Sequence, residues 1–177
     1  ERRVELQHHV SDLGIYALEK TNLQKIVEKT ARDSIKLLGI DYFLLFSTHP
    51  ENGYLQLLSS NLEDLENSTD PLPVSSNSDI SFAFHSSDLI WTPNYKLERR
   101  YRLIPALEQI NIISGILIST GSDTKKNGVL CLYRCSSHPF NKPEIQYIKC
   151  VARILGASIA RYHETTKSSK INEKLDF

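Results

Sequence analysis

The sequence predicts one mixed α/β (α+β) domain in which helices from both ends of the chain pack on one face of a mostly antiparallel sheet. The chain has 177 residues, a length typical of one domain with its own core. Apolar residues recur with helical spacing over 6–18, 23–38 and 145–162. Between these segments, short apolar runs are separated by turn residues, as in β-hairpins. Because hairpins build antiparallel sheets, the flanking helices are expected to cover one sheet face.

Composition and charge exclude several classes of protein. Apolar residues make up 40% of the chain, and no apolar run approaches the roughly 20 residues of a membrane span. The 21 basic and 21 acidic side chains cancel, which gives no electrostatic reason to bind nucleic acid or an anionic membrane. The first residues, 1–3, mix acid and base without the apolar stretch of a signal peptide. We expect a cytoplasmic segment that contacts neither nucleic acid nor membrane.

The first two segments have the periodicity and the end signals of helices. The apolar positions of the first helix alternate in steps of four and three, as in a coiled-coil seam: Leu6, Val10, Leu13 and Ala17. Asn22 is a favoured N-cap residue for the second helix. Gly39 supplies the left-handed residue that commonly follows a last helical turn.

A first hairpin and a long polar loop follow. Residues 42–47 form a short, aromatic-rich strand, and Pro50–Gly53 has the composition of a turn that leads into strand 54–59. Residues 60–78 are polar and contain two prolines, so we expect a loop there. Long loops in compact domains are often functional or mobile.

Short elements are expected in the middle of the chain. In chain order they are a helix at 79–86 capped by Ser78, a brief strand at 89–91, a helix at 105–109, and the two clearest strands at 112–119 and 128–134. The polar turn 121–127 joins the last two strands into a second hairpin.

The closing helix carries a longer seam. Its apolar residues step by three and four: Ile145, Ile148, Ala152, Leu155, Ile159 and Tyr162. Such a stripe can pack on the domain's own sheet or on a partner helix, and we favour a parallel homodimer through the terminal helices. Because the chain has no methionine, we expect it to be cut from a longer protein. We divide it into a dimerising helix (1–20), a central domain (21–164) and a helical tail (165–177).

Several segments, in this order, resemble a bacterial signalling GAF domain over about residues 12–164. They are Leu13–Leu18, Leu38–Tyr42, Ile113–Ile118, and Gly128–Tyr133 followed by Pro139, Phe140 and Glu144. The resemblance implies dimerising helices on one face of the sheet and a small-molecule pocket on the other, beneath the loop-rich middle. It also implies that 21–164 are a sensory domain and that 165–177 are a helical connector to an output domain. Such an output domain would be a kinase, a diguanylate cyclase or a transcription activator, and thus part of two-component or cyclic di-GMP signalling.

Departures from the family narrow the function. No cysteine lies within 59–124, so the covalent bilin attachment of some members is not expected. The signature of the cyclic-nucleotide-binding members is missing, and Cys131, Cys135 and Cys150 do not match the methionine-sulfoxide-reducing members. Cys131 and Cys135 would also lie roughly 13 Å apart along an extended strand, too far for a disulfide. The sequence indicates no cofactor, metal site or catalytic residue. A cysteine-based redox enzyme is therefore the least favoured hypothesis of function.

Seven residues of the middle section are candidates for ligand contact: His85, Trp91, Asn94, Tyr95, Arg99, Tyr101 and Ser114. His85 is either a haem ligand or an ordinary histidine at a helix end. The aromatic residues either stack on a planar ligand or fill the core under the loop. The basic cluster beside Tyr101, formed by Arg99, Arg100 and Arg102, either holds a carboxylate or phosphate or belongs to a solvated face. The sequence therefore predicts a sensory module, with a ligand-free dimerisation and relay spacer as the alternative.

Overall fold

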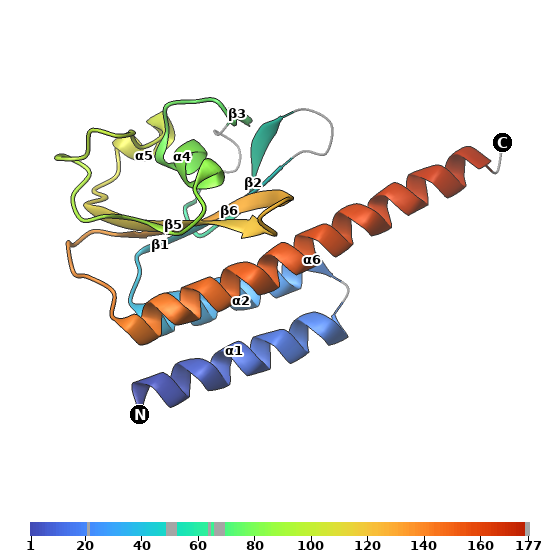
Figure 1. Ribbon diagram of the computed structural model, residues 1–177, viewed down its shortest axis with the longest axis horizontal. Coiled ribbons are helices and arrows are strands. Elements are labelled where there is room, and N and C mark those ends of the chain that lie inside the picture. The colour runs from blue at the N-terminus through green and yellow to red at the C-terminus, as the bar shows by residue number, and fades with distance from the viewer. Residues whose placement is uncertain (21, 49–52, 64, 66–69, 176–177) are drawn as a thin grey trace.

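The computed structural model describes residues 1–20, 22–48, 53–63, 65 and 70–175 (Figure 1). Its helices are α1 (Arg2–Glu19), α2 (Leu23–Leu38), α4 (Asp79–His85), α5 (Pro105–Glu108) and α6 (Lys142–Leu175). Its strands are β1 (Tyr42–Thr48), β2 (Tyr54–Ser60), β3 (Leu72–Pro73), β4 (Ile90–Thr92), β5 (Ser114–Gly121) and β6 (Lys126–Arg134). The strands form one six-stranded sheet in the order β3-β2-β1-β6-β5-β4, and neighbouring strands are antiparallel throughout. The predicted fold class is confirmed.

The three long helices and the short helices lie on opposite sides of the sheet. Figure 1 shows α1, α2 and α6 below the strands, with α4 and α5 above them. The two predicted hairpins, β1–β2 and β5–β6, are joined by pairing of β1 with β6 at the centre of the sheet. The irregular middle of the chain therefore covers one sheet face, where a pocket can form.

Alternation of side chains along β1 divides the interior into two cores. Phe43 and Leu45 pack toward α2 and α6, whereas Leu44 and Phe46 pack toward α4 and the following loops. Both sets are fully buried. A strand that is covered on both faces reads as a continuous apolar run, which is why the sequence of β1 does not show which face lies near a pocket.

The predicted end signals are confirmed at three positions. The Asn22 side chain accepts hydrogen bonds from the backbone N–H groups of Gln24 and Lys25, at 3.0 and 3.4 Å. The Ser78 hydroxyl accepts from the N–H of Ser81 at 3.1 Å and so caps α4. Gly39 has a φ of 61°, in the left-handed region.

One segment differs from the sequence-based expectation, and the last helix extends beyond its predicted apolar stripe, 145–162. Leu72–Pro73 form the edge strand β3 inside the predicted loop 60–78, paired with Tyr54 and Leu55 of β2. A proline is tolerated there because an edge strand leaves one row of N–H groups unpaired. The last helix also continues without a break from Lys142 to Leu175. The role of residues 165–177 as a connector stays a prediction, and 50–52 of the predicted turn fall outside the described residues.

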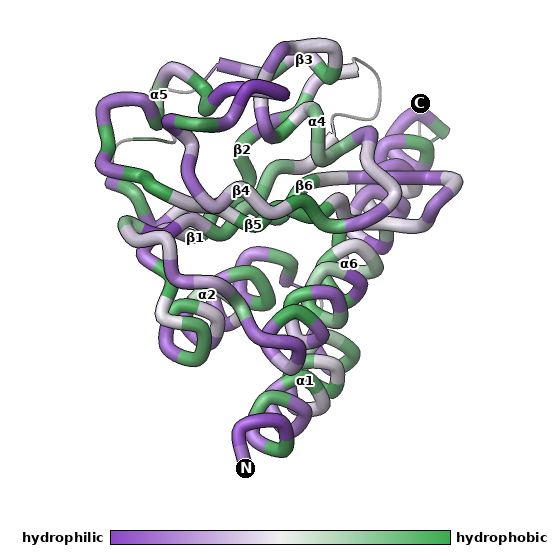
Figure 2. The backbone as a smooth tube through the Cα atoms, turned by 60° about the vertical axis from the view of Figure 1, so that its left-hand side comes forward, coloured by the Kyte–Doolittle hydropathy of each residue, from purple (hydrophilic) through white to green (hydrophobic). Residues whose placement is uncertain are grey.

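The two predicted coiled-coil seams face the interior of the domain. Leu6 and Leu13 of α1 are buried in the same core as Ile148 and Leu155 of α6. Figure 2 shows hydrophobic and hydrophilic residues alternating along these helices. Most of both seams is thus buried within the chain, whereas Tyr162, the last residue of the α6 seam, is 50% exposed.

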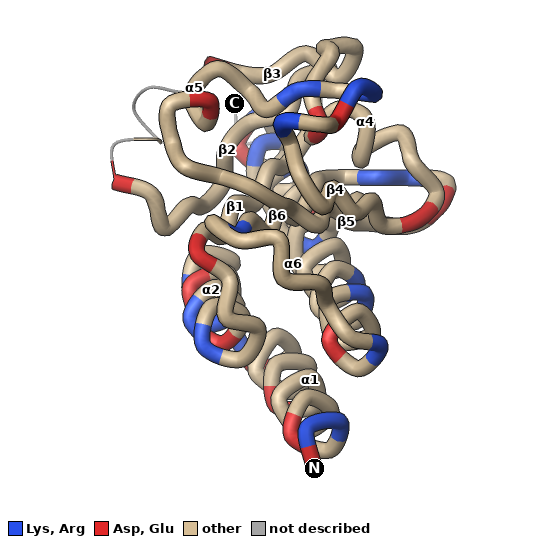
Figure 3. Tube along the Cα trace, turned by 90° about the vertical axis from the view of Figure 1, so that its left-hand side faces the viewer, with Lys and Arg blue, Asp and Glu red and all other residues tan. Residues whose placement is uncertain are grey.

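Charged residues are mixed along the surface. Figure 3 shows acidic and basic positions close together on α1, α2 and α6 and in the loop before α5. In the part of the chain that the structure describes, no helix is long and apolar enough to cross a membrane.

A glycine in α6 allows the closest approach between this helix and the sheet. A Cβ atom on Gly156 would lie 2.3 Å from the backbone nitrogen of Gly121, at the end of β5. Gly14 in α1 is a matched control, because a Cβ there would meet nothing closer than 4.0 Å.

We expect Gly156→Ala to lower the free energy of unfolding by about 2 kcal/mol, because overpacking outweighs the gain in helix propensity. Gly14→Ala should raise it by up to about 1 kcal/mol. Urea unfolding of both variants measures the difference. Stabilisation by Gly156→Ala would contradict the close packing.

Candidate functional site

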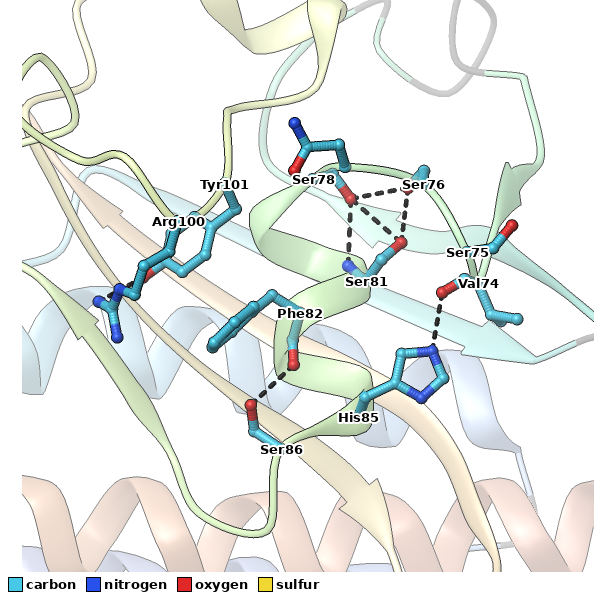
Figure 4. A pocket seen from close by; sticks show the side chains of 11 residues that line it. Val74, Ser75, Ser76, Ser78, Ser81, Phe82, His85, Ser86, Arg100 and Tyr101 are labelled. Atoms are coloured by element: carbon cyan, nitrogen blue, oxygen red, sulfur yellow. Dashed lines mark hydrogen bonds between the residues drawn. The ribbon is translucent and has the colours of Figure 1, made fainter.

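A pocket of about 340 Å³ opens on the face of the sheet opposite α6. Three pieces of chain line it: the loop 74–78, helix α4 and its C-cap Ser86, and the pair Arg100–Tyr101 (Figure 4). Serines are the commonest residue type in the lining, and no acidic side chain belongs to it.

Three serine hydroxyls form a connected cluster along one wall. Ser81 donates to the carbonyl oxygen of Pro73 at 3.1 Å, and Ser78 donates to the Ser81 hydroxyl at 3.2 Å. The Ser76 hydroxyl lies 2.6 Å from that of Ser81 and 3.0 Å from that of Ser78. The hydroxyl protons of Ser78 and Ser81 are therefore used within the cluster. This wall offers mainly acceptor lone pairs to a bound molecule.

The opposite wall is aromatic and carries one cation. The rings of Phe82 and Tyr101 have centroids 4.8 Å apart. The guanidinium carbon of Arg100 lies 5.6 Å from the Phe82 centroid and 5.0 Å from the Tyr101 centroid. Phe82 is 39% exposed, an unusual exposure for such a large apolar side chain beside a pocket.

Glu98 holds Arg100 in place. The Nε and Nη2 atoms of Arg100 donate to the two carboxylate oxygens of Glu98 at 2.9 and 3.0 Å. These hydrogen bonds lower the pKa of Glu98 to about 2. Nη2 also donates to the Tyr101 hydroxyl at 3.1 Å, which in turn lies 2.5 Å from the Thr92 hydroxyl. Among the described residues, Nη1 of Arg100 has no hydrogen-bond partner, so it can donate to a ligand.

His85 closes one end of the pocket. Its Nε2 lies 2.8 Å from the carbonyl oxygen of Val74. Because a carbonyl can only accept, Nε2 carries the proton in this bond, and Nδ1 of the neutral ring is left as an acceptor.

A buried carboxylate lies beneath the pocket, at the first residue of α4. Asp79 is 0% exposed, and its Oδ2 accepts hydrogen bonds from the hydroxyls of Tyr95 and Tyr133 at 2.8 and 2.7 Å. Its Oδ1 accepts from the N–H of Ile80 at 2.9 Å. Burial raises the pKa of Asp79 to about 6, although the tyrosine hydrogen bonds act in the opposite direction. No described residue forms an ion pair with it.

The structure brings two of the seven predicted site residues into the pocket lining, His85 and Tyr101. Tyr95 lies below the pocket, on Asp79. Arg99 is exposed, and its neighbour Arg100 contributes to the pocket instead.

The other three predicted residues lie elsewhere. Trp91 packs with the core on the helix-covered face, with its ring centroid 5.7 Å from that of Phe140. The Asn94 side chain accepts from the N–H of Lys96 at 3.0 Å, as in a local turn. The buried Ser114 hydroxyl donates to the carbonyl oxygen of Ser136. The structure gives each of these side chains a local packing or hydrogen-bonding role.

Sequence reasoning missed Asp79, Phe82 and the serine cluster. The serine-rich run at 75–78 was the available signal for the cluster, but such runs are common in loops. Asp79 follows the N-cap Ser78 and looks like an ordinary first-turn acid. Nothing in the sequence marks it as buried.

The three cysteines are free and differ in environment. Cys131 is fully buried in β6, and burial raises the pKa of its thiol well above the usual value. Burial also raises the pKa of the Cys135 thiol. A raised pKa disfavours the nucleophilic thiolate form. Among the described residues, no three His, Cys, Asp or Glu side chains are grouped to hold a metal ion.

Comparisons with solved structures find close matches of fold. The GAF domain of a phosphoenolpyruvate-protein phosphotransferase from Coxiella burnetii is 18% identical, with a TM-score of 0.81, covering 96% of this chain and 99% of that chain. A free methionine-R-sulfoxide reductase from Neisseria meningitidis, in complex with its substrate, is 12% identical, with a TM-score of 0.75 and coverages of 93% and 94%. The GAF domain of a two-component sensor histidine kinase from Bacillus halodurans is 16% identical, with a TM-score of 0.67 and coverages of 83% and 99%. At these identities the likeness shows the fold alone.

A search of curated proteins gave no match. The model of the GAF domain family matches residues 22–159. This range runs from the N-cap of α2 into α6 and contains the whole sheet and the pocket. The chain belongs to the GAF domain family.

Proposed function

We propose that this chain is the sensory or regulatory module of a larger cytoplasmic signal-transduction protein, and that it binds a small molecule in the pocket above α4. The observation that carries the proposal is the pocket itself, where two separate pieces of chain present hydrogen-bonding groups not fully used by the protein. Arg100 Nη1 is a free donor among the described residues, and His85 Nδ1 is a free acceptor in the neutral ring. Solvent-facing groups of this kind orient ligands in pockets.

The lining favours a planar molecule that is neutral or anionic. The exposed face of Phe82 offers a stacking surface, and the serine wall offers lone pairs to N–H or O–H groups. Arg100 can donate to a carbonyl or carboxylate group at the other end. Because no acidic side chain lines the pocket, a cation would be desolvated without compensation.

A regulatory role fits better than catalysis. The raised pKa values of the Cys131 and Cys135 thiols disfavour cysteine chemistry. Solved neighbours include GAF domains of sensor histidine kinases, and another is a methyl-accepting chemotaxis protein. By analogy, the output would be a kinase, a diguanylate cyclase or a transcription activator.

A homodimer would use the outer face of α1. Val4, Ile15 and Leu18 are all exposed there, although the predicted seam of the same helix is buried. Ile171 and Leu175 near the end of α6 are also exposed apolar residues on one helical face. In this arrangement the relay would run through the α6 helix of each protomer.

Native mass spectrometry of the protein purified from its own host tests the function. We expect a retained small molecule, and its addition back to stripped protein should raise the melting temperature in a dose-dependent way. Phe82→Ala should weaken binding about tenfold or more through lost stacking. Tyr54→Ala, which removes an exposed aromatic ring outside the pocket, should leave binding unchanged.

A clean apo protein that no metabolite stabilises would contradict ligand sensing. That result would favour the alternative of a dimerisation and relay spacer. Equal loss of binding in both variants would place the ligand outside this pocket.

A further inference from the structure

We propose that α4 and α6 are coupled across the sheet by two pairs of adjacent residues in β6, Lys126–Asn127 and Tyr133–Arg134. In each pair one residue is bonded to the pocket helix α4, and its neighbour is bonded to α6 or to the segment that leads into it. A change in α4 would then alter how α6 is held at two separate points. The signalling meaning of this coupling rests on the proposed ligand site, but the coupling itself can be measured without a ligand.

The first pair lies at the beginning of β6. The Nζ of Lys126 donates to the carbonyl oxygen of Ser86, the C-cap of α4, at 2.5 Å. The side-chain amide of Asn127 donates to the carbonyl oxygen of Gly156 in the middle of α6, at 2.8 Å. Its oxygen accepts from the Thr120 hydroxyl at 2.8 Å, which fixes the orientation of the amide.

The second pair lies at the end of β6. The hydroxyl of Tyr133 donates to Asp79, the first residue of α4. The guanidinium of Arg134 donates to the carbonyl oxygens of Leu38, at the end of α2, and of His138, in the connection to α6.

Two further contacts extend Arg134 to the start of α6. Its guanidinium lies 3.9 Å from the Glu144 carboxylate in the first turn of the helix. It also lies over the ring of Phe140, 3.7 Å from the centroid.

Strand geometry explains why neighbouring residues reach opposite faces. Successive side chains of a strand alternate, so Tyr133 points toward α4 and Arg134 toward α6. Near the other end, the pairing of β5 with β6 shifts register between Thr120 and Gly121. Such a bulge re-aims the side chains beside it, here at Asn127.

The two pairs hold α4 at both of its ends. Figure 1 shows α4 and α6 on opposite sides of the strands that separate them. A molecule that binds between α4 and Arg100 and shifts either end of α4 would change the hydrogen bond from Lys126 or from Tyr133 to that end. Because coupling between two sites is reciprocal, a perturbation on the α6 side should also reach α4.

Hydrogen–deuterium exchange of the whole chain tests the coupling. Lys126→Met removes the bond to Ser86, and Lys125→Met is the matched control, since the Lys125 side chain is exposed and bonds to no described residue. We expect Lys126→Met to speed amide exchange about fivefold both in α4 and in α6 around Gly156. Lys125→Met should leave both helices within about twofold of the wild type.

Reciprocal variants complete the test. Asn127→Ala, which acts on the α6 side, should speed exchange in α4, and Tyr133→Phe should speed exchange in the first turns of α6. Acceleration that stays on the mutated side of the sheet in Lys126→Met and Asn127→Ala would overturn the proposal. Because no ligand is added, that outcome would leave the proposed function standing. Conversely, if the protein binds no small molecule, the exchange experiment still measures the coupling between α4 and α6.

Discussion

Between pH 4 and pH 7, the ionisation of Asp79 is expected to remove about 2 kcal/mol from the free energy of unfolding. The pKa of this carboxyl is about 6 in the folded chain, against 3.8 for an ordinary aspartate. The full contribution is roughly 3 kcal/mol, and part of it is already lost at pH 4 because the unfolded carboxyl is more than half ionised there.

The sign follows from proton binding. Between the two pKa values the folded state holds the proton more tightly than the unfolded state, so stability falls as the pH rises. The contribution is fully present below pH 3.8 and is lost as the pH passes through about 6. Glu98 acts in the opposite direction, since its pKa is lowered to about 2. The Asp79 contribution must therefore be isolated by a difference between variants.

Urea unfolding at pH values from 4 to 7.5 measures it. The difference between the wild type and Asp79→Asn should change by about 2 kcal/mol over this range, since the amide does not ionise. Asp123→Asn is the control, because Asp123 is exposed, and its curve should run parallel to the wild type. Parallel curves for Asp79→Asn and the wild type would show that the carboxyl is solvated and the buried arrangement wrong.

Arg134→Met is expected to lower the free energy of unfolding by about 3–5 kcal/mol. Arg134 is 4% exposed, and Glu144 is 8% exposed. Removal of the guanidinium leaves this carboxylate without its cation and the carbonyl oxygens of Leu38 and His138 without their donors. Removing one partner of a buried ion pair lowers the free energy of unfolding strongly, because the other partner stays desolvated without its counter-charge.

Two further variants make this result specific. Arg134→Lys should recover part of the loss, because it keeps the charge but not the planar group that lies over Phe140 and reaches several oxygens at once. Arg153→Met, which removes an exposed cation from α6, should change stability by less than about 0.5 kcal/mol. Thermal or urea unfolding suffices. An Arg134→Met variant as stable as the wild type would mean that the methionine packs as well as the guanidinium binds.

Local signals in the sequence predicted the elements well. Helix spacing, the caps Asn22 and Ser78, and the left-handed Gly39 depend on residues within one turn of each other. The two hairpins likewise depend on nearby turn residues. The edge strand Leu72–Pro73 was missed because it has only two residues and its proline argues against a strand.

Part of the candidate site could be predicted as well. His85 was expected at a pocket because it ends a short helix in the loop-rich middle, and Tyr101 because it lies within a basic cluster in the same section. Trp91 was predicted at the pocket because it is an aromatic residue in the same section, yet its side chain points to the helix-covered face. A one-residue change of position along a strand reverses the face, and composition does not reveal it.

By itself, the sequence determined the mixed α/β class, the order of the elements and the apolar stripes of the terminal helices, because these follow from spacing along the chain. The tertiary structure alone decided what those stripes contact, and it turned the seam of α6 toward the domain's own core. It also decided that Asp79 meets Tyr133, 54 positions away, beneath the pocket. Such meetings depend on strand pairing and on which face each side chain takes, and both are set by the packing of the whole chain.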